Sequence, residues 1–238
     1  MTYDVDKGPG ARLGLVVLSS DETLEDEARA IMKGDLSLYH TRIECAPDVT
    51  PETLAAMEAR MVAAASLLPA GLHAIGYGCT SASVVIGPEA VAAQMHQVQA
   101  GVPVTNPISA VVAGLEALGA RRIAMVTPYL PQVVAPMRAF LEARGIEVLA
   151  ENSFGECDDR RVARIAECST LQAMRDAMAD GVEAVFSSCT NLRSFGIIDA
   201  AEAELGVPVI SSNSALLWHL AQLGGVDNLN GPGRLFSG

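Results

Sequence analysis

The 238-residue chain contains an internal duplication, and this repeat constrains its fold more than any other feature. Three landmarks recur in the same order at offsets of 105 to 110 residues: 11–20 and 120–129, 72–81 and 182–191, 101–119 and 206–225. A single short match arises easily by chance, but three matches in register indicate two copies of one structural unit. We therefore expect two similar lobes.

Each copy alternates short apolar runs with Ala-rich segments. The runs "RLGLVVLSS", "RRIAMVTPY" and "VEAVFSS" have the composition of buried strands, and the segments between them show helical spacing. Strand, helix and strand in repetition predict an α/β fold with a parallel sheet covered by helices in each lobe. Helices are expected over 50–68, where Thr50 is the cap, and over segments that end at Gly145 and Gly181 in left-handed conformation.

The repeat also sets the expected domain boundaries. The first lobe spans 11–117, the second spans 118–213, and a C-terminal helix at 214–225 packs back on the first lobe. No linker rich in Pro, Gly or Ser separates the lobes, so we expect them to pack closely. Residues 226–238 are expected to form a glycine-rich tail.

Composition narrows the class of partner. The net charge of −12, with only 16 Lys and Arg residues, argues against nucleic-acid binding, which needs a clustered basic face. No apolar run approaches the roughly 18 residues of a membrane-spanning helix, and the first residues do not resemble a targeting segment. We expect a cytoplasmic protein with a small-molecule substrate and no membrane partner, and a homodimer on the general frequency of two-fold assemblies.

Five cysteines without CxxC spacing do not indicate a disulfide framework. Four scattered histidines lack the spacing of metal ligands, so we expect no metal site and no cofactor.

Two Cys-Thr segments, "GYGCTSAS" at 76–83 and "SSCTNLRS" at 187–194, are the candidate site. Each follows an apolar run, and ligands of open parallel sheets bind at the carboxyl ends of the strands. Cys79 and Cys189 are therefore expected to face each other across a cleft. A thiol at the start of a helix has a lowered pKa, so we expect a thiolate near neutral pH. One sulfur would act as base or nucleophile while the other delivers a proton.

A cysteine at the end of a buried strand is usually an inert small hydrophobe. The matched placement of Cys79 and Cys189 favours catalysis, whereas Cys45, Cys157 and Cys168 are interpreted as structural. Hydroxyl and amide groups near the strand ends would bind a carboxylate and its developing charge. The candidate substrate-binding residues are Ser20, Asp21, Thr80, Ser81, Tyr129, Thr190 and Asn191.

In this order, "GYGCTSAS", "RIAMVTPY" and "SSCTNLRS" resemble the aspartate/glutamate racemase superfamily, in particular its branch of maleate cis-trans isomerases and arylmalonate decarboxylases. The resemblance covers about residues 11 to 225, and "GPGRLF" is similar to the end of the decarboxylases. It implies two pseudo-two-fold-related Rossmann-like lobes with a cofactor-independent site between them.

The resemblance also implies roles. In the isomerases, the cysteine matching Cys79 adds to the substrate double bond and the one matching Cys189 manages the proton. In the racemases, the same pair removes and returns an α-proton from opposite faces. The decarboxylases keep only the second cysteine, so decarboxylation is the least expected activity. The tyrosine matching Tyr129 is expected to contact substrate.

One segment departs from the isomerase pattern. Where maleate isomerases carry an asparagine that binds a substrate carboxylate, "LSSDET" at 18–23 has Asp21. An aspartate repels a carboxylate and attracts a cationic group, which favours an amino acid or an acylated diamino acid as substrate. Racemases of the wider superfamily also place an aspartate there, and a related protein encoded with ectoine-degradation enzymes is similar at this segment.

The sequence therefore predicts a cofactor-independent two-cysteine isomerase that acts on a small carboxylate. Racemisation is favoured slightly over cis-trans isomerisation. The alternatives are a non-catalytic metabolite-binding homologue and a lyase similar to arylmalonate decarboxylase.

Overall fold

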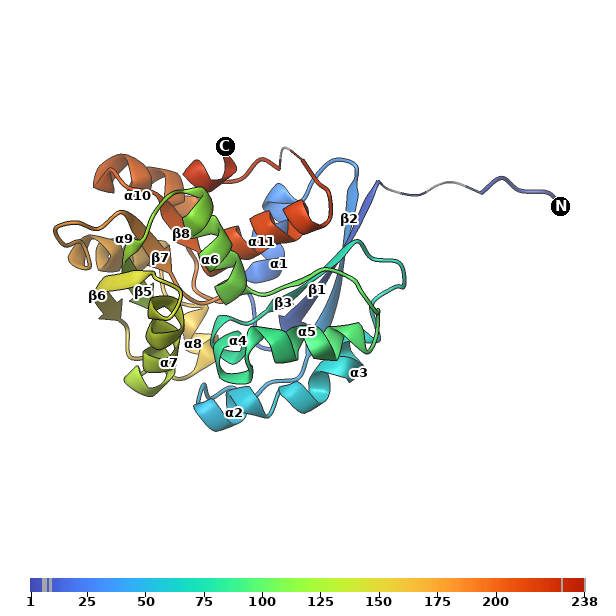
Figure 1. Cartoon of the computed structure of the whole chain (residues 1–238), viewed down its shortest axis with the longest axis horizontal. Helices are drawn as coiled ribbons and strands as arrows, with labels where there is room; N and C mark the ends of the chain where they lie inside the picture. The colour runs from blue at the N-terminus through green and yellow to red at the C-terminus, as the bar shows by residue number, and fades with distance from the viewer. Residues whose placement is uncertain (6–7, 9, 228, 238) are drawn as a thin grey trace.

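Two four-stranded parallel sheets form the frame of the protein in a computed structural model, which describes residues 1–5, 8, 10–227 and 229–237 (Figure 1). The first sheet has the order β2 (Leu36–Ile43), β1 (Ala11–Leu18), β3 (Ala74–Gly78) and β4 (Val104–Thr105). The second has the order β6 (Glu147–Ser153), β5 (Arg122–Thr127), β7 (Ala184–Ser187) and β8 (Val209–Ser211). The two orders are equivalent, so the predicted α/β class with two similar lobes is confirmed.

The inner and outer strands differ in burial. The inner strands β1, β3, β5 and β7 are buried almost throughout, because helices cover both faces of a parallel sheet. Of the strands at the sheet edges, β8 is buried, whereas β2 and β6 are only partly buried and carry several polar side chains; β2 and β6 are called the outer strands below. Neither outer strand is an apolar run, and the sequence pattern did not predict them.

Helices connect the strands. Those of the first half are α1 (Leu24–Ile31), α2 (Pro51–Ala55), η1 (Glu58–Arg60), α3 (Met61–Ala65), α4 (Thr80–Ile86), α5 (Pro88–His96) and α6 (Pro107–Ala117). Those of the second half are α7 (Pro131–Glu142), α8 (Asp159–Val162), α9 (Glu167–Asp176), η2 (Phe195–Ile197), α10 (Ile198–Leu205), α11 (Ser212–Leu223) and η3 (Arg234–Phe236).

The structure confirms the predicted cap and turn residues but not one of the predicted helices. Thr50 caps α2 with its side chain, and Gly145 and Gly181 have φ values of 75° and 86°, as expected. The single helix expected over 50–68 is wrong, because this segment divides into α2, η1 and α3. Neither Pro nor Gly lies at the break, so tertiary packing overrides the local helical preference.

The last helix of each half joins the two lobes. Helices α6 and α11 pack against each other, and α11 also packs on β3 and β4 of the first sheet. Leu216 and Leu220 of α11 share a buried cluster with Leu13 and Leu15 of β1. A second, larger cluster of buried residues extends across both sheets and includes α6. The two lobes are therefore fixed to each other by a continuous core.

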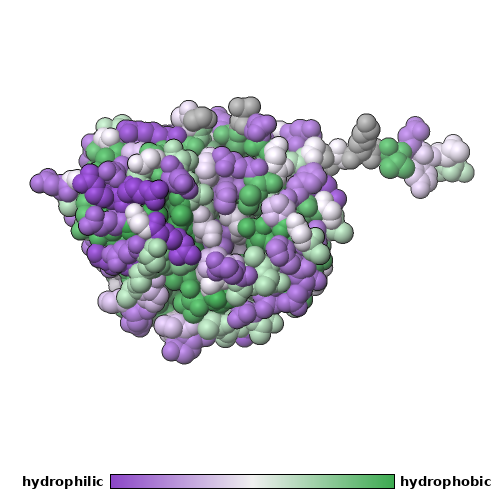
Figure 2. Space-filling model, viewed as in Figure 1, coloured by the Kyte–Doolittle hydropathy of each residue, from purple (hydrophilic) through white to green (hydrophobic). Residues whose placement is uncertain are grey.

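Polar and apolar residues are interspersed on the face of the molecule seen in Figure 2, without one continuous apolar area. Residues 1–5 are exposed and lie away from the body of the protein (Figure 1). Within the described residues, the longest helices, α7 and α11, have 12 residues each, and none is long and apolar enough to cross a membrane.

Candidate active site

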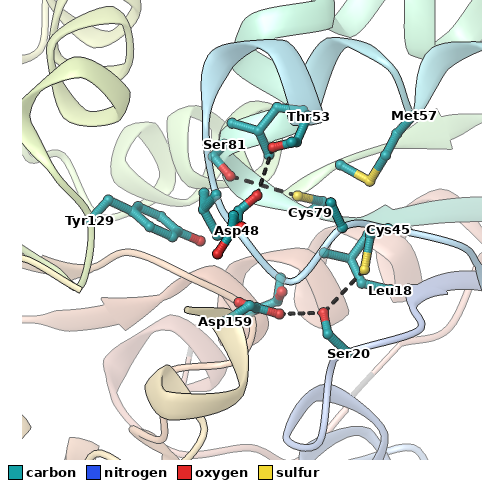
Figure 3. A pocket seen from close by; sticks show the side chains of 14 residues that line it. Leu18, Ser20, Cys45, Asp48, Thr53, Met57, Cys79, Ser81, Tyr129 and Asp159 are labelled. Carbon is teal, nitrogen blue, oxygen red and sulfur yellow. Dashed lines mark hydrogen bonds between the residues drawn. The ribbon is translucent and has the colours of Figure 1, made fainter. Parts of the chain in front are cut away.

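A small cavity of about 20 Å³ lies where the carboxyl ends of the two sheets meet (Figure 3). It has room for about one water molecule, so the site is closed. The polar and sulfur-bearing residues around it include Ser20, Cys45, Asp48, Cys79 and Ser81 of the first lobe, and Tyr129, Asp159 and Thr190 of the second. Both lobes thus contribute to one site, and Tyr129 and Cys45 reach it from opposite sides in Figure 3.

Cys79 follows β3 directly and is the N-cap residue of α4. Its Sγ accepts a hydrogen bond from the backbone N–H of Ala82 at 3.4 Å and lies 3.8 Å from the Ser81 hydroxyl. Burial nevertheless raises the pKa of the Cys79 thiol to about 12, because the loss of solvation outweighs the two hydrogen bonds that lower it. The expectation of a thiolate near neutral pH is therefore wrong for the closed site.

Cys189 follows β7 but has a different local structure. Its φ of 129° is the one positive value of a non-glycine residue in the described chain, a conformation that costs about 1–3 kcal/mol. Its backbone N–H donates to Ser212 Oγ at 3.0 Å, and the N–H of Asn191 donates to its Sγ at 3.3 Å. A turn follows and the next helical residue is Phe195, so the expected helix start is wrong here.

Burial also controls the ionisation of Cys189. It raises the pKa of this thiol well above its ordinary value, and the charge of Asp159 raises it further. A hydrogen bond with Tyr129 and the one from Asn191 act in the opposite direction. The two thiols of the site are therefore both protonated in the closed state, in unequal surroundings.

The two Cys-Thr segments lie in contact. Thr80 Oγ1 donates to Ser212 Oγ at 2.7 Å. The Ser212 hydroxyl also accepts from the backbone N–H of Cys189, so it links the two segments. Burial raises the pKa of Tyr129 well above its ordinary value, and the charges of Cys189 and Cys79 add to this effect. Tyr129 and Cys79 line the cavity together, whereas Cys189 is not one of its lining residues and reaches it only through its neighbour Thr190.

The predicted substrate-binding residues divide into two groups. Those that line the cavity are Ser20, Ser81, Tyr129 and Thr190. The other three, Asp21, Thr80 and Asn191, lie behind it. Asp21 Oδ1 accepts from the backbone N–H groups of Thr23 and Leu24 at 2.9 and 2.8 Å, so this carboxyl caps α1. Burial raises the pKa of Asp21 to about 6, although both N–H groups lower it.

Asn191 connects the loops around the cavity. Its Oδ1 accepts from the backbone N–H of Glu22 at 2.9 Å, and its Nδ2 donates to the backbone oxygen of Asp159 at 2.9 Å. These bonds join the segment after β1, the segment after β6 and the Cys189 turn. The placement gives Asn191 a supporting position rather than one on the cavity wall.

Sequence reasoning missed several residues of the cavity wall, among them Asp159, Cys45 and Asp48. Asp159, which is 4% exposed, accepts from the Ser20 hydroxyl and from Asn191 Nδ2, and burial raises its pKa. Cys45, interpreted as structural, has its Sγ 3.1 Å from Ser20 Oγ, and Asp48 lies nearby at the wall. All three follow the outer strands, which the apolar pattern did not reveal. The duplication was the available signal, because each inner pair of strands needs its outer neighbour.

The charge of the cavity wall is negative. Its described residues include two carboxyl groups, those of Asp48 and Asp159, and none of them is Arg, Lys or His. Arg42 approaches from outside, where it donates to the backbone oxygen of Asp21 at 2.9 Å and pairs with Glu25 at 2.7 Å. No group of three or more His, Cys, Asp or Glu residues suited to a metal ion occurs in the described part of the chain.

Comparisons with known proteins agree with this geometry. The family model of arylmalonate decarboxylase matches residues 13–236. The chain belongs to the arylmalonate decarboxylase family. This assignment confirms the predicted branch of the racemase superfamily.

Known proteins that resemble the chain include maleate isomerases. That of Nocardia farcinica is 34% identical over 217 residues, which cover 86% of each chain. The structure of maleate isomerase Iso from Pseudomonas putida S16, solved as a cysteine mutant with maleate, has a TM-score of 0.88 and 26% identity over 96% of this chain and 98% of that one.

A mutant of the Nocardia farcinica maleate cis-trans isomerase, solved with a covalently bound succinylcysteine intermediate, has a TM-score of 0.86 and 30% identity over 95% of this chain and 98% of that one. These similarities support the predicted enzyme class, a cofactor-independent isomerase with cysteine chemistry.

Proposed function

We propose that the protein is a cofactor-independent isomerase in which Cys79 and Cys189 act on one small carboxylate held between them. The observation that carries this proposal is the contact between the two Cys-Thr segments, whose cysteines are both buried: Thr190 Oγ1 donates to the backbone oxygen of Gly78 at 3.4 Å. The Cys79 sulfur accepts from the N–H of Ala82 in helix α4, whereas Cys189 has a strained backbone and accepts from the N–H of Asn191 in a turn. These unequal surroundings support different roles for the two sulfurs.

Cis-trans isomerisation is the first candidate reaction, and the maleate isomerase relatives support it. The Cys79 thiolate would add to one carbon of the double bond, and the displaced electron pair would move toward the neighbouring carboxylate. Rotation about the new single bond and expulsion of the thiolate would then give the trans product. The Cys189 thiol would lend a proton to the carbanion and take it back.

Racemisation is the second candidate, and the carboxyl groups of Asp48 and Asp159 at the cavity wall favour it. Here one sulfur would remove the α-proton of an amino acid or derivative, and the other would protonate the opposite face. The hydroxyls of Ser81, Tyr129 and Thr190 would stabilise the charge that develops on the substrate carboxylate in either reaction. A link to ectoine utilisation stays a prediction.

Substrate entry requires the cavity to enlarge, because a four-carbon acid is several times larger than the single water that fits. The segment after β2 covers the site and is attached to the segment after β6. Val49 N–H donates to the backbone oxygen of Cys157 at 2.9 Å, and Asp159 N–H donates to that of Pro47 at 3.0 Å. Displacement of this segment would admit substrate and also hydrate the thiols, which favours the thiolate.

Proton NMR in D₂O tests the proposal. Purified protein is incubated with maleate, with four- and five-carbon mono- and dicarboxylates, and with amino and diamino acids. Appearance of fumarate supports cis-trans isomerisation, and loss of a Cα–H signal supports racemisation. A ligand that raises the unfolding temperature of the wild type but is never converted would identify a non-catalytic binding protein and end the proposal.

A further inference from the structure

The Asp159 carboxylate has one unused oxygen at the cavity. Its Oδ2 accepts from Ser20 and Asn191, while Oδ1 accepts no hydrogen bond from any residue that the structure describes. The side chain lines the cavity together with Cys79 and Tyr129 (Figure 3). Asp159 is only 4% exposed, and its Oδ1 can still accept a hydrogen bond. Buried polar atoms are usually hydrogen-bonded, so we expect a bound ligand to supply the donor.

No cation of the chain balances this carboxylate in the described structure. The neighbouring arginines are engaged with other acidic groups, because Arg160 pairs with Asp158 at 3.0 Å and Arg164 pairs with Glu22. Asp48 adds a second carboxyl group to the cavity lining, but this residue is exposed to solvent, so the buried charge is that of Asp159. A buried charge without a partner is unfavourable, and a dianionic ligand would add repulsion to it.

We propose that Asp159 is a specificity-determining residue that binds an ammonium group of the substrate, so that the cavity selects a small carboxylate bearing a cationic nitrogen. The ammonium donates to Asp159 Oδ1, and the carboxylate of the same molecule meets the hydroxyls of Ser81, Tyr129 and Thr190. This orientation places the reacting carbon beside Cys79 and next to Thr190, the neighbour of Cys189. The inference rests on the proposed isomerase function and names its substrate class.

Binding of an ammonium group also affects the thiols. The charge of Asp159 raises the pKa of both Cys189 and Cys79 in the closed site. An ammonium ion beside Asp159 offsets that charge, so the thiolate becomes easier to form when the correct substrate is bound. The substrate thereby supplies the positive charge that the cavity wall does not contain.

Binding measurements on matched ligand pairs test this inference. Isothermal titration calorimetry on the Cys79→Ser variant compares aspartate with succinate, glutamate with glutarate, and 2-aminobutanoate with butanoate, with both enantiomers of each amino acid. The members of each pair differ in the amino group alone. At least one amino acid is expected to bind about tenfold or more tightly than its partner. Adding Asp159→Asn is expected to abolish that preference.

Asp158→Asn is the matched control, since it removes the same charge one residue away, where Asp158 pairs with Arg160 outside the cavity. It should keep the preference, and unfolding temperatures confirm that each variant folds. Equal binding within every pair overturns the inference, as does an Asp159→Asn variant that weakens both members of a pair equally.

The inference and the proposed function fail in different ways. Conversion of an acid that lacks nitrogen, without preference for its aminated partner, overturns the ammonium site and leaves the isomerase intact. Selective binding of the amino acid without turnover by the wild-type protein supports the ammonium site and overturns the isomerase function.

Discussion

At Cys189, the ordinary advantage of alanine over glycine at a buried position should be reduced or reversed. Its φ of 129° is strained for any residue with a Cβ atom, whereas Cys79, equally buried at 2% exposure, has a relaxed φ of −149°. Alanine and glycine at Cys189, compared with alanine and glycine at Cys79, therefore isolate the strain. Both substitutions at one site remove the same sulfur, so that loss cancels.

The expected magnitude follows from three contributions. The Cys79→Gly variant should be less stable than the Cys79→Ala variant by about 1–2 kcal/mol. Glycine gives the unfolded chain more conformational entropy, worth about 0.5–1 kcal/mol, and it removes a buried methyl group worth about 0.8 kcal/mol. At Cys189 the same losses apply, but glycine also escapes about 1–3 kcal/mol of backbone strain. The glycine-minus-alanine difference should thus shift by about 1–3 kcal/mol between the two sites.

Equilibrium unfolding in urea measures the four free energies, with similar m-values as the condition for comparing them. A glycine-minus-alanine difference that is the same at both sites would refute the strain. In that case the backbone of Cys189 would not be strained, and the strained backbone could no longer support different roles for the two thiols.

Three further outcomes are expected. Iodoacetamide should modify the exposed Cys157 and Cys168 well before the buried Cys79 at pH 7, and modification of Cys79 should accelerate as pH rises toward its raised pKa; peptide mass spectrometry showing Cys79 first would contradict this. Burial raises the pKa of Glu27 from 4.5 to about 8, so protonated Glu27 stabilises the fold at low pH and this contribution is lost as pH rises from about 4.5 to 8. The wild type should lose stability relative to Glu27→Gln across that range in a pH series of unfolding curves, and parallel curves would exclude the effect. Asn191→Ala should lower the free energy of unfolding by about 1–3 kcal/mol, because it leaves the N–H of Glu22 and the backbone oxygen of Asp159 without their partner. Ordinary surface substitutions change this free energy by up to about 0.5 kcal/mol, so a smaller change in urea unfolding would show that these bonds do not join the loops.

The duplication and the apolar runs were sufficient to predict three of the four strands of each sheet, all except β2 and β6. Strands such as β1 and β5 are buried on both faces, so their sequences are continuous runs of apolar residues. The outer strands β2 and β6 have one face partly in solvent and contain residues such as His40 and Asn152. Their polar composition concealed them, although the repeat of the inner strands implied that they exist.

The same difference explains which site residues were found. Cys79 and Cys189 follow inner strands, and the hydroxyl of Thr190, next to Cys189, donates to the backbone oxygen of Gly78, next to Cys79. Asp159 and Cys45 follow the outer strands and could not be placed without them. Asp21 was expected to contact substrate, and the structure shows its carboxyl capping α1. The sequence identified the correct loop for Asp21. The direction of its side chain is set by hydrogen bonds from the backbone N–H groups of Thr23 and Leu24, which the sequence pattern does not reveal.

Local chemistry around the thiols was the hardest part to predict. A cysteine before a helix suggests a low pKa, yet burial in the closed cavity outweighs the N–H group of Ala82 and raises the pKa of Cys79 to about 12. Burial depends on the segment after β2 that covers the site, and no local pattern in the sequence describes that cover. The near-identical Cys-Thr segments also concealed their different backbones.

The central claim is that two thiols act on the same substrate molecule. Its most direct test is the kcat of Cys79→Ser and of Cys189→Ser on the acid identified by the D₂O screen, with the exposed Cys168→Ser as the control. Each of the first two variants should lose at least about 10³-fold in kcat while its unfolding temperature still rises with ligand, and the control should match the wild type. Wild-type turnover by either Cys79→Ser or Cys189→Ser would contradict the account.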